Sequence, residues 1–231
     1  MTLKIVAVNS SPNMERGNTA LILTPFLEGM REMGAEVELF YTKKLRIRPC
    51  QGEFDCATKT PGECFQNDDM KMLYPKLVDA DIWVFASPLY VSSINGPMKN
   101  LWDRMIIPMG EPRTVFKGGR SHHPMREGIK SGKIILVSSC GYWKIDNFDL
   151  IIEQTEEFAY HAARDYWGAL LRPHAYALRQ MLDSGNEADD VIEAARNAGR
   201  HLIEHGDMTI RLLKGVSREL VPLESYVSEV E

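Results

Sequence analysis

Short apolar runs alternate with amphipathic segments along most of the chain. Residues 5–8 are apolar and rich in β-branched side chains, and the polar turn 9–12 follows them, a pattern that predicts a buried strand and a loop. From Thr19 the apolar positions repeat at helical spacing, and Gly34 is well placed to end that helix. Alternation over residues 37–41 then predicts a second strand.

The same alternation continues to about residue 202. Further strands are expected at 81–86, at 134–137 and between Arg172 and Leu178, and further helices at 68–76, 96–105, 151–162 and 188–202. Strands that alternate with helices form a parallel sheet with helices on both faces. The predicted fold class is therefore α/β, a three-layer α-β-α sandwich around a five-stranded parallel sheet.

Two segments do not follow this alternation. Residues 42–67 contain three of the four cysteines, and residues 107–132 are rich in Gly, Pro and basic side chains. Long irregular insertions in compact domains are often functional. After Gly206 we expect a short helix and an extended arm that packs on a partner subunit. Residues 1–231 are expected to form a single domain that carries these additions.

Composition excludes some classes of function. The net charge of −5 disfavours a general nucleic-acid binder, and no run approaches the roughly 18 apolar residues of a membrane span. The N-terminus has no apolar signal-peptide core. We therefore expect a cytoplasmic protein that binds neither nucleic acid nor membrane, with its cysteines as free thiols or metal ligands rather than disulfides.

The loop from Ser10 to Thr19 is the first candidate site, because ligands of open parallel sheets bind beyond the carboxyl ends of the strands. It leads into a helix N-terminus, where unpaired N–H groups and the helix dipole suit a phosphate. Ser10, Asn18 and Thr19 add donors, and Arg16 adds charge. The loop lacks both the P-loop and G-x-G-x-x-G patterns, which favours a monophosphate. The alternative is a polar turn with Asn18 or Thr19 as an ordinary N-cap.

Two further loops follow predicted strands. Residues 87–99 combine Tyr90 with small polar residues, and residues 138–143 combine small residues with Tyr142 and Trp143. A flat aromatic cofactor could lie against either loop. The alternative for both is an ordinary connection from strand to helix, with Tyr90 as a packing residue.

Taken together, the loops resemble a known family. The pattern is Ser-x-Pro-x-x-x-x-Gly-Asn-Thr at 10–19, Ala-Ser-Pro-Leu-Tyr at 86–90, Gly-x-Met-Lys at 96–99 and then Asp103-Arg104. It resembles the NADPH-dependent FMN reductase family over about residues 3 to 145, and within it the branch of iron-sulfur flavoproteins and multimeric flavodoxins. The resemblance implies a flavodoxin-like fold, bound FMN and a homodimer or homotetramer.

The resemblance also implies roles for individual residues. Ser10, Asn18 and Thr19 would hold the FMN phosphate, Pro88, Leu89, Tyr90 and Val91 would line the isoalloxazine, and Ser139, Gly141 and Tyr142 would close its other edge. Ser11 and Ala20 are further expected cofactor-binding residues. No catalytic side chain is named, because a flavin carries its own redox chemistry. The predicted function is hydride transfer from NAD(P)H through FMN to a quinone or similar acceptor. The alternatives are a flavodoxin-type electron carrier and a phosphate-binding regulatory domain without flavin.

The cysteine segment resembles the four-cysteine motif of iron-sulfur flavoproteins. Cys50, Cys56 and Cys64 are present, but Glu53 stands in place of one cysteine. A [4Fe–4S] cluster normally needs four thiolates, and a carboxylate is a poor ligand for it. Cys140 could supply the fourth thiolate only if the loops brought it near this segment, and it lies beside the expected flavin. We therefore expect no iron-sulfur cluster and no other metal; the alternative is an iron-sulfur or zinc site on the three cysteines.

Two groups of basic side chains are further candidates. His201 and His205 are four residues apart on a predicted helix, a spacing that can bind a metal, but solvated histidines are far commoner. Within residues 107–132, Arg120 and Arg126 suggest that this insertion covers the flavin and meets the NADPH phosphate; the alternative is an exposed loop. On the first hypothesis, replacing both arginines with Ala raises the KM for NADPH and leaves that for NADH unchanged.

Overall fold

The computed structural model of this chain describes residues 2–185 and 188–228, and its centre is a parallel sheet. The strands of that sheet are β1 (Lys4–Asn9), β2 (Glu36–Tyr41), β3 (Ile82–Pro88), β6 (Lys133–Ser139) and β7 (Asp165–Arg172). They lie in the order β2-β1-β3-β6-β7, and every neighbouring pair is parallel. This arrangement confirms the predicted α/β fold with a five-stranded parallel sheet.

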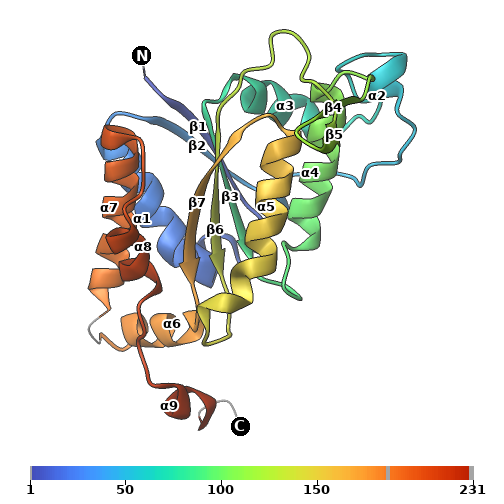
Figure 1. Cartoon of the computed structure of the whole chain (residues 1–231). Coiled ribbons are helices and arrows are strands. Elements are labelled where there is room, and N and C mark those ends of the chain that lie inside the picture. The colour runs from blue at the N-terminus through green and yellow to red at the C-terminus, as the bar shows by residue number, and fades with distance from the viewer. Residues whose placement is uncertain (1, 186–187, 229–231) are drawn as a thin grey trace.

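Helices cover both faces of the sheet (Figure 1). One face packs against α1 (Asn18–Glu32), α7 (Asp189–His205) and α8 (Ile210–Ser217), and the other against α3 (Met70–Asp79), α4 (Gly96–Met109) and α5 (Asp149–His161). Successive strand residues alternate between the two cores: Trp83 and Phe85 lie in the core with α3, α4 and α5, whereas Val84 and Ala86 lie in the core with α1 and α7. None of the described helices combines the length and the apolar character that crossing a bilayer would require.

Helices α1 and α7 approach each other very closely. A Cβ atom built on Gly29 would lie 2.0 Å from the carbonyl oxygen of Arg196, and one built on Gly199 would lie 2.0 Å from that of Phe26. Both helices can therefore meet backbone to backbone only because these two positions lack a side chain.

The prediction of a strand between Arg172 and Leu178 is wrong. Strand β7 lies one element earlier, at Asp165–Arg172, and the residues after it form α6 (Ala175–Asp183). β7 is an edge strand whose side chains are mostly half-buried, and it contains Gly168 at φ 105° beside an irregular register with β6. An edge strand with this interruption lacks the continuous apolar run that marks the central strands.

The insertion 42–67 starts at the carboxyl end of β2, where Lys43 donates to the carbonyl of Pro12 at 2.8 Å, but α2 and the insertion 107–132 lie at the opposite end of the sheet. Helix α2 (Asp55–Thr58) of the cysteine segment and the hairpin of β4 (Val115–Lys117) and β5 (Arg120–His122) gather near the C-terminal end of α4 (Figure 1). Because α4 runs antiparallel to the strands, this end is opposite the edge where α6 lies. The predicted short helix and arm after Gly206 are α8 followed by an extended segment and α9 (Leu223–Ser228).

Candidate functional site

A hollow lies where β1, β3 and β6 end. Its wall combines residues from all three predicted loops with residues from α6: Ser11, Asn13, Arg16, Gly17, Asn18, Thr19, Pro88, Leu89, Tyr90, Ser139, Cys140, Gly141, Ala175 and Tyr176. The parallel sheet therefore brings together loops that are far apart in the sequence, at the edge where α/β folds bind ligands.

The N-terminus of α1 opens onto this hollow without a side-chain cap. Gly17 is the N-cap residue, so neither Asn18 nor Thr19 caps the helix as the alternative for this loop supposed. A helix start leaves backbone N–H groups without helical partners, and they carry partial positive charge. A Cβ atom at Gly17 would lie 2.4 Å from the Ser11 hydroxyl, so glycine lets the two turns of the loop meet.

Two arginines lie beside this helix start. Arg16 is exposed and lines the hollow. Arg179 of α6 donates to the carbonyl oxygens of Arg16 (3.0 Å) and Gly17 (3.2 Å) and to Oδ1 of Asn18 (3.3 Å). Arg179 thus fixes the loop from outside, while Arg16 offers its charge to a bound anion.

The loops are also fastened to one another. The hydroxyls of Thr19 and Ser139 share a hydrogen bond of 2.8 Å, and the Leu89 N–H donates to the carbonyl of Ser139 at 3.0 Å. The amide of Asn95 donates to the carbonyl of Ser10 at 2.7 Å. These bonds hold the first, second and third loops in one rigid frame.

The mouth of the hollow carries exposed aromatic side chains. Tyr90 is 49% exposed, Tyr142 59% and Tyr176 67%. A Cβ atom on Gly141 would lie 3.0 Å from the Tyr176 ring, so glycine lets that ring close over the third loop. Val91 is 97% exposed at φ 49°, at the tip of a turn closed by bonds between Tyr90 and Ser93. A flat ring in the hollow would therefore contact aromatic side chains that are exposed in this structure.

The C-terminal segment braces the third loop. Trp143 donates its indole N–H to the carbonyl of Val221 at 2.9 Å, and the Tyr226 hydroxyl donates to the carbonyl of Gly141. The fully buried Arg172 donates to the carbonyls of Val216 and Arg218, each at 2.7 Å. Residues 216–226 thus lie across the carboxyl ends of β6 and β7, where they support the wall of the hollow.

His174 belongs to the same brace and is held neutral. Its Nε2 accepts from Arg172 (2.7 Å) and from the Leu220 N–H (3.1 Å), so its Nδ1 carries the proton and donates to the carbonyl of Trp143 at 3.2 Å. Burial lowers the pKa of His174 to about 4, and the neighbouring charge of Arg172 acts in the same direction.

This pKa shift predicts a stability that depends on pH. In the unfolded chain His174 takes up a proton below about pH 6.5, whereas in the folded chain it does so only near pH 4. The unfolded chain therefore binds more protons between these two values, and the stability falls as the pH falls from 6.5 towards 4. From pH 7 to pH 5 the free energy of unfolding should drop by about 2 kcal/mol through this residue. Urea titrations of the His174→Gln variant should lose that part of the drop, whereas the exposed control His205→Gln should keep it. An equal drop in all three proteins would contradict this assignment.

Most of the predicted site residues line the hollow, and four do not. Ser11, Asn18, Thr19, Pro88, Leu89, Tyr90, Ser139 and Gly141 lie in its wall. The other four predicted residues are Ser10, whose hydroxyl is buried against the carbonyl of Ala86, the buried Ala20, and the exposed Val91 and Tyr142 beyond the wall. The wall also contains Tyr176, Ala175, Asn13 and Gly17, which the sequence analysis does not name as binding residues, and Cys140, which it places only beside the expected flavin. A correct placement of β7 would have indicated Ala175 and Tyr176, since these residues begin the helix that follows it.

The insertion 107–132 does not reach the hollow of its own chain. Arg120 pairs with Glu157 near the end of α5 and lies over the ring of Tyr160, with its guanidinium carbon 4.1 Å from the ring centre. Arg126 donates to the carbonyl of Ala57 in α2 at 3.3 Å. Both side chains therefore lie at the opposite end of the sheet, and the hypothesis that they meet the NADPH phosphate would need the hollow of another subunit.

The family of this chain follows from its match to a family model described as NADPH-dependent FMN reductase, which covers residues 3–141. The chain belongs to this family. The matched residues include β1, β3, β6, the first two loops of the hollow and the third loop as far as Gly141. The predicted family placement is thereby confirmed.

Relatives within the NADPH-dependent FMN reductase family match only part of the chain. An iron-sulfur flavoprotein of Archaeoglobus fulgidus is 34% identical over 102 residues, 44% of this chain and 48% of the relative. An iron-sulfur flavoprotein of Methanocaldococcus jannaschii is 28% identical over 116 residues, 50% of this chain and 57% of the relative. The chain thus spans about half the length of the curated relatives that it matches.

Solved structures of reductases share the fold. A putative quinone reductase from Klebsiella pneumoniae superposes with a TM-score of 0.64 at 17% identity, covering 97% of this chain and 99% of that one. An NAD(P)H:quinone oxidoreductase from Methanothermobacter marburgensis gives 0.61 at 18% identity, with 89% and 98% covered. At this identity the similarity establishes the flavodoxin-like architecture, as predicted.

The cysteine segment holds three cysteines, one fewer than the four thiolates that the iron-sulfur cluster suggested by the names of these relatives normally needs. No group of three or more metal-binding side chains comes together in the described part of the chain. Cys140 lies in the wall of the hollow, at the other end of the sheet from α2. Glu53 stands in the fourth position, and a carboxylate is a poor ligand for such a cluster.

His201 and His205 also fail to form a metal site. Their rings lie 4.4 Å apart, but His201 is paired with Asp207 at 2.9 Å, and no third ligand joins them among the described residues. These contacts favour the interpretation of His201 and His205 as ordinary surface histidines.

Proposed function

We propose that this chain binds FMN in the hollow and transfers a hydride from NAD(P)H through it to a quinone-like acceptor. The observation that carries the proposal is the uncapped start of α1 beside Arg16, opposite a mouth lined by Tyr90 and Tyr176. The helix start suits a phosphate, and the aromatic side chains suit a flat ring. Family membership supports the same cofactor.

In this proposal the chain positions FMN and does no acid–base chemistry itself. The phosphate would be held by the backbone N–H groups at the start of α1 with Ser11, Asn18, Thr19 and Arg16. The second loop (Pro88–Val91) and the third (Ser139–Tyr142) would hold the ring, and Ser10 and Ala20 would support the phosphate loop from behind. When bound, FMN supplies the capacity to accept a hydride and pass electrons on. The rigid frame of loops keeps its ring in place.

The proposal includes a homodimer or homotetramer in the cytoplasm. The exposed side chains of Tyr90, Val91, Tyr142 and Tyr176 around the mouth support an assembly, because a second subunit over the hollow would remove this apolar surface from water. Such a subunit would also narrow access to the ring for water. Oligomers of enzymes with a shared site commonly close in this symmetric way.

The test is FMN-dependent turnover. The purified protein, loaded with FMN, should oxidise NADPH in the presence of benzoquinone at about 1 to 100 turnovers per second, well above free FMN at the same concentration. The loss of NADPH absorbance measures the rate. A yellow protein that does not oxidise NADPH would identify an electron carrier instead, and a protein that takes up no FMN would defeat both functions.

A further inference from the structure

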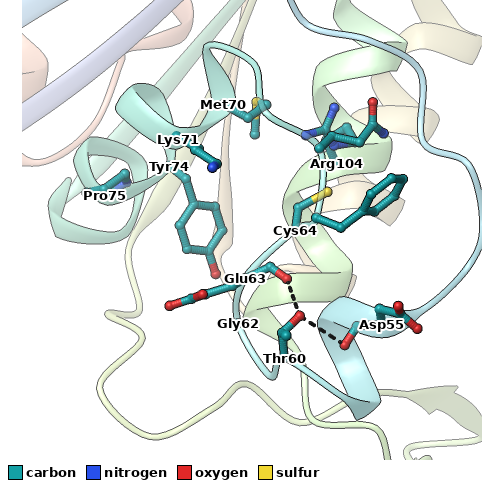
Figure 2. A pocket seen from close by; sticks show the side chains of 12 residues that line it. Asp55, Thr60, Gly62, Glu63, Cys64, Met70, Lys71, Tyr74, Pro75 and Arg104 are labelled. Carbon is teal, nitrogen blue, oxygen red and sulfur yellow. Dashed lines mark hydrogen bonds between the residues drawn. The ribbon is translucent and has the colours of Figure 1, made fainter.

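Three arginines are buried in the described part of the chain, and only one of them donates to a carboxylate. Arg104, in the wall of the cavity that Figure 2 shows, donates to Asp68 at 2.8 Å. Arg164 and Arg172 donate only to neutral acceptors. Because burying a cation without a counter-ion costs free energy, the charge at these two positions calls for an explanation.

The guanidinium of Arg172 is fully buried at the carboxyl end of β7. It donates to the carbonyls of Pro173, Val216 and Arg218 and to Nε2 of His174, each at 2.7 Å. None of these four acceptors carries a negative charge. Burial lowers the pKa of Arg172 to about 10, so the side chain remains a cation at pH 7.

The charged groups around Arg172 do not cancel its charge. Arg218 brings a second positive charge, and Asp190 brings a negative charge that also acts on Arg172. The Asp190 carboxylate is itself bonded to Arg218, at 2.7 Å from its Nη2 atom. Two cations and one carboxylate leave this cluster with one positive charge in excess, and the neutral His174 adds none.

This charge lies next to the third loop of the hollow. Arg172 is paired with Ser139 in the sheet, and its carbonyl accepts from the Cys140 N–H at 3.1 Å. Both Ser139 and Cys140 line the hollow. Burial raises the pKa of the Cys140 thiol to about 11, whereas the charge of Arg172 acts to lower it. The field of the guanidinium therefore extends to the wall of the hollow.

We propose that Arg172 stabilises the negative charge that an FMN ring in the hollow gains on reduction, and so raises the reduction potential of the bound flavin. This inference rests on the proposed function. A hydride carries two electrons and one proton, so its transfer leaves NAD(P)H as NAD(P)⁺ and adds one negative charge to the ring. Because the protein interior screens charges less than water does, Arg172 acts across the third loop through its field, without contact.

The reduction potential of bound FMN tests this role. It is measured on the FMN-loaded full-length protein, by equilibrating the flavin absorbance with a reference dye of known potential. Arg172→Met keeps a long side chain without the charge. The equilibrium constant for two-electron reduction should fall about tenfold, which corresponds to about 30 mV. Arg172→Lys, which keeps the charge, should leave the potential close to that of the natural protein.

Arg164 provides the matched control, because it is buried and also donates to neutral acceptors only. It donates to the carbonyls of Ala80 (2.8 Å) and Asp81 (3.3 Å), just before β3 begins, and so lies at the opposite end of the sheet from the hollow. Arg164→Met should destabilise the fold but leave the potential of bound FMN unchanged. An unchanged potential in Arg172→Met, or equal shifts in both variants, would overturn the proposal.

A second variant tests the same field with the opposite sign. Asp190 is exposed, so Asp190→Asn should fold even if Arg172→Met does not. It removes the negative charge of the cluster, and the equilibrium constant for reduction should rise about twofold, since solvent screens an exposed charge. An unchanged or lower constant would contradict the proposal. Bound FMN with the wrong potential defeats this inference alone, whereas a protein that takes up no FMN defeats the proposed function as well.

Discussion

Replacing Gly199 with alanine is expected to lower the free energy of unfolding by about 3 kcal/mol, one of the largest effects of a single methyl group in this protein. The new Cβ atom would lie 2.0 Å from the carbonyl oxygen of Phe26 and 3.1 Å from the N atom of Met30. Both are backbone atoms of α1 and cannot rotate away. Helices α1 and α7 must separate, and the buried contacts of Phe26 and Ala195 loosen with them.

The sign of this effect distinguishes packing from helix propensity. In a helix interior, alanine is favoured over glycine by about 1 kcal/mol, so propensity alone predicts a more stable protein. Urea unfolding of Gly199→Ala and of its counterpart Gly29→Ala should show destabilisation instead. Gly96→Ala is the matched control, because a Cβ atom there meets nothing within 4 Å. A stabilised Gly199→Ala protein would contradict the close helix crossing.

The central strands could be predicted from the sequence because their environment leaves a simple pattern. Residues 82–86 and 134–137 are buried on both faces of the sheet, so every position is apolar. Strand β7 lies at the edge of the sheet and pairs with β6 alone. Its side chains are mostly half-buried and Gly168 lies in its middle, so its sequence lacks that apolar pattern. The expected strand was therefore placed one element too late.

The misplaced fifth strand also explains which site residues could not be predicted from the sequence. The loops after β1, β3 and β6 were recognised because strands of a parallel sheet end at one edge. Tyr176 and Arg179 lie on α6, a helix that the misplaced strand had replaced. Their contribution to the hollow depends on how α6 packs across the sheet edge, which local periodicity does not encode.

The positions of the insertions depend on contacts between distant residues. Helix α4 continues to Met109, beyond the expected end at 105, and so carries the 107–132 segment to the far end of the sheet. The buried pair of Arg104 and Asp68 ties the cysteine segment to this helix. In the sequence, Asp103-Arg104 is noticeable only as part of a family pattern. The structure shows that Arg104 pairs with Asp68, 36 residues away, and local sequence does not indicate a contact over that separation.

Recognition of a phosphate by the start of α1 predicts a strong preference for FMN over riboflavin. Both molecules have the same ring, and only FMN carries the phosphate. Several N–H groups at the uncapped helix start, the Thr19 and Asn18 side chains and Arg16 face the proposed phosphate position. Hydrogen bonds to a charged group contribute about 1.5–3 kcal/mol, so FMN should bind at least about 100-fold more tightly.

Equilibrium titration of flavin fluorescence into the flavin-free protein measures this preference directly. We expect a dissociation constant for FMN about 100-fold below that for riboflavin, and a several-fold weaker binding of FMN alone in Arg16→Gln. Arg31→Gln, a change of the same charge at the other end of α1, should leave both constants unchanged. Equal affinity for FMN and riboflavin, or no binding of either, would contradict the account of this site.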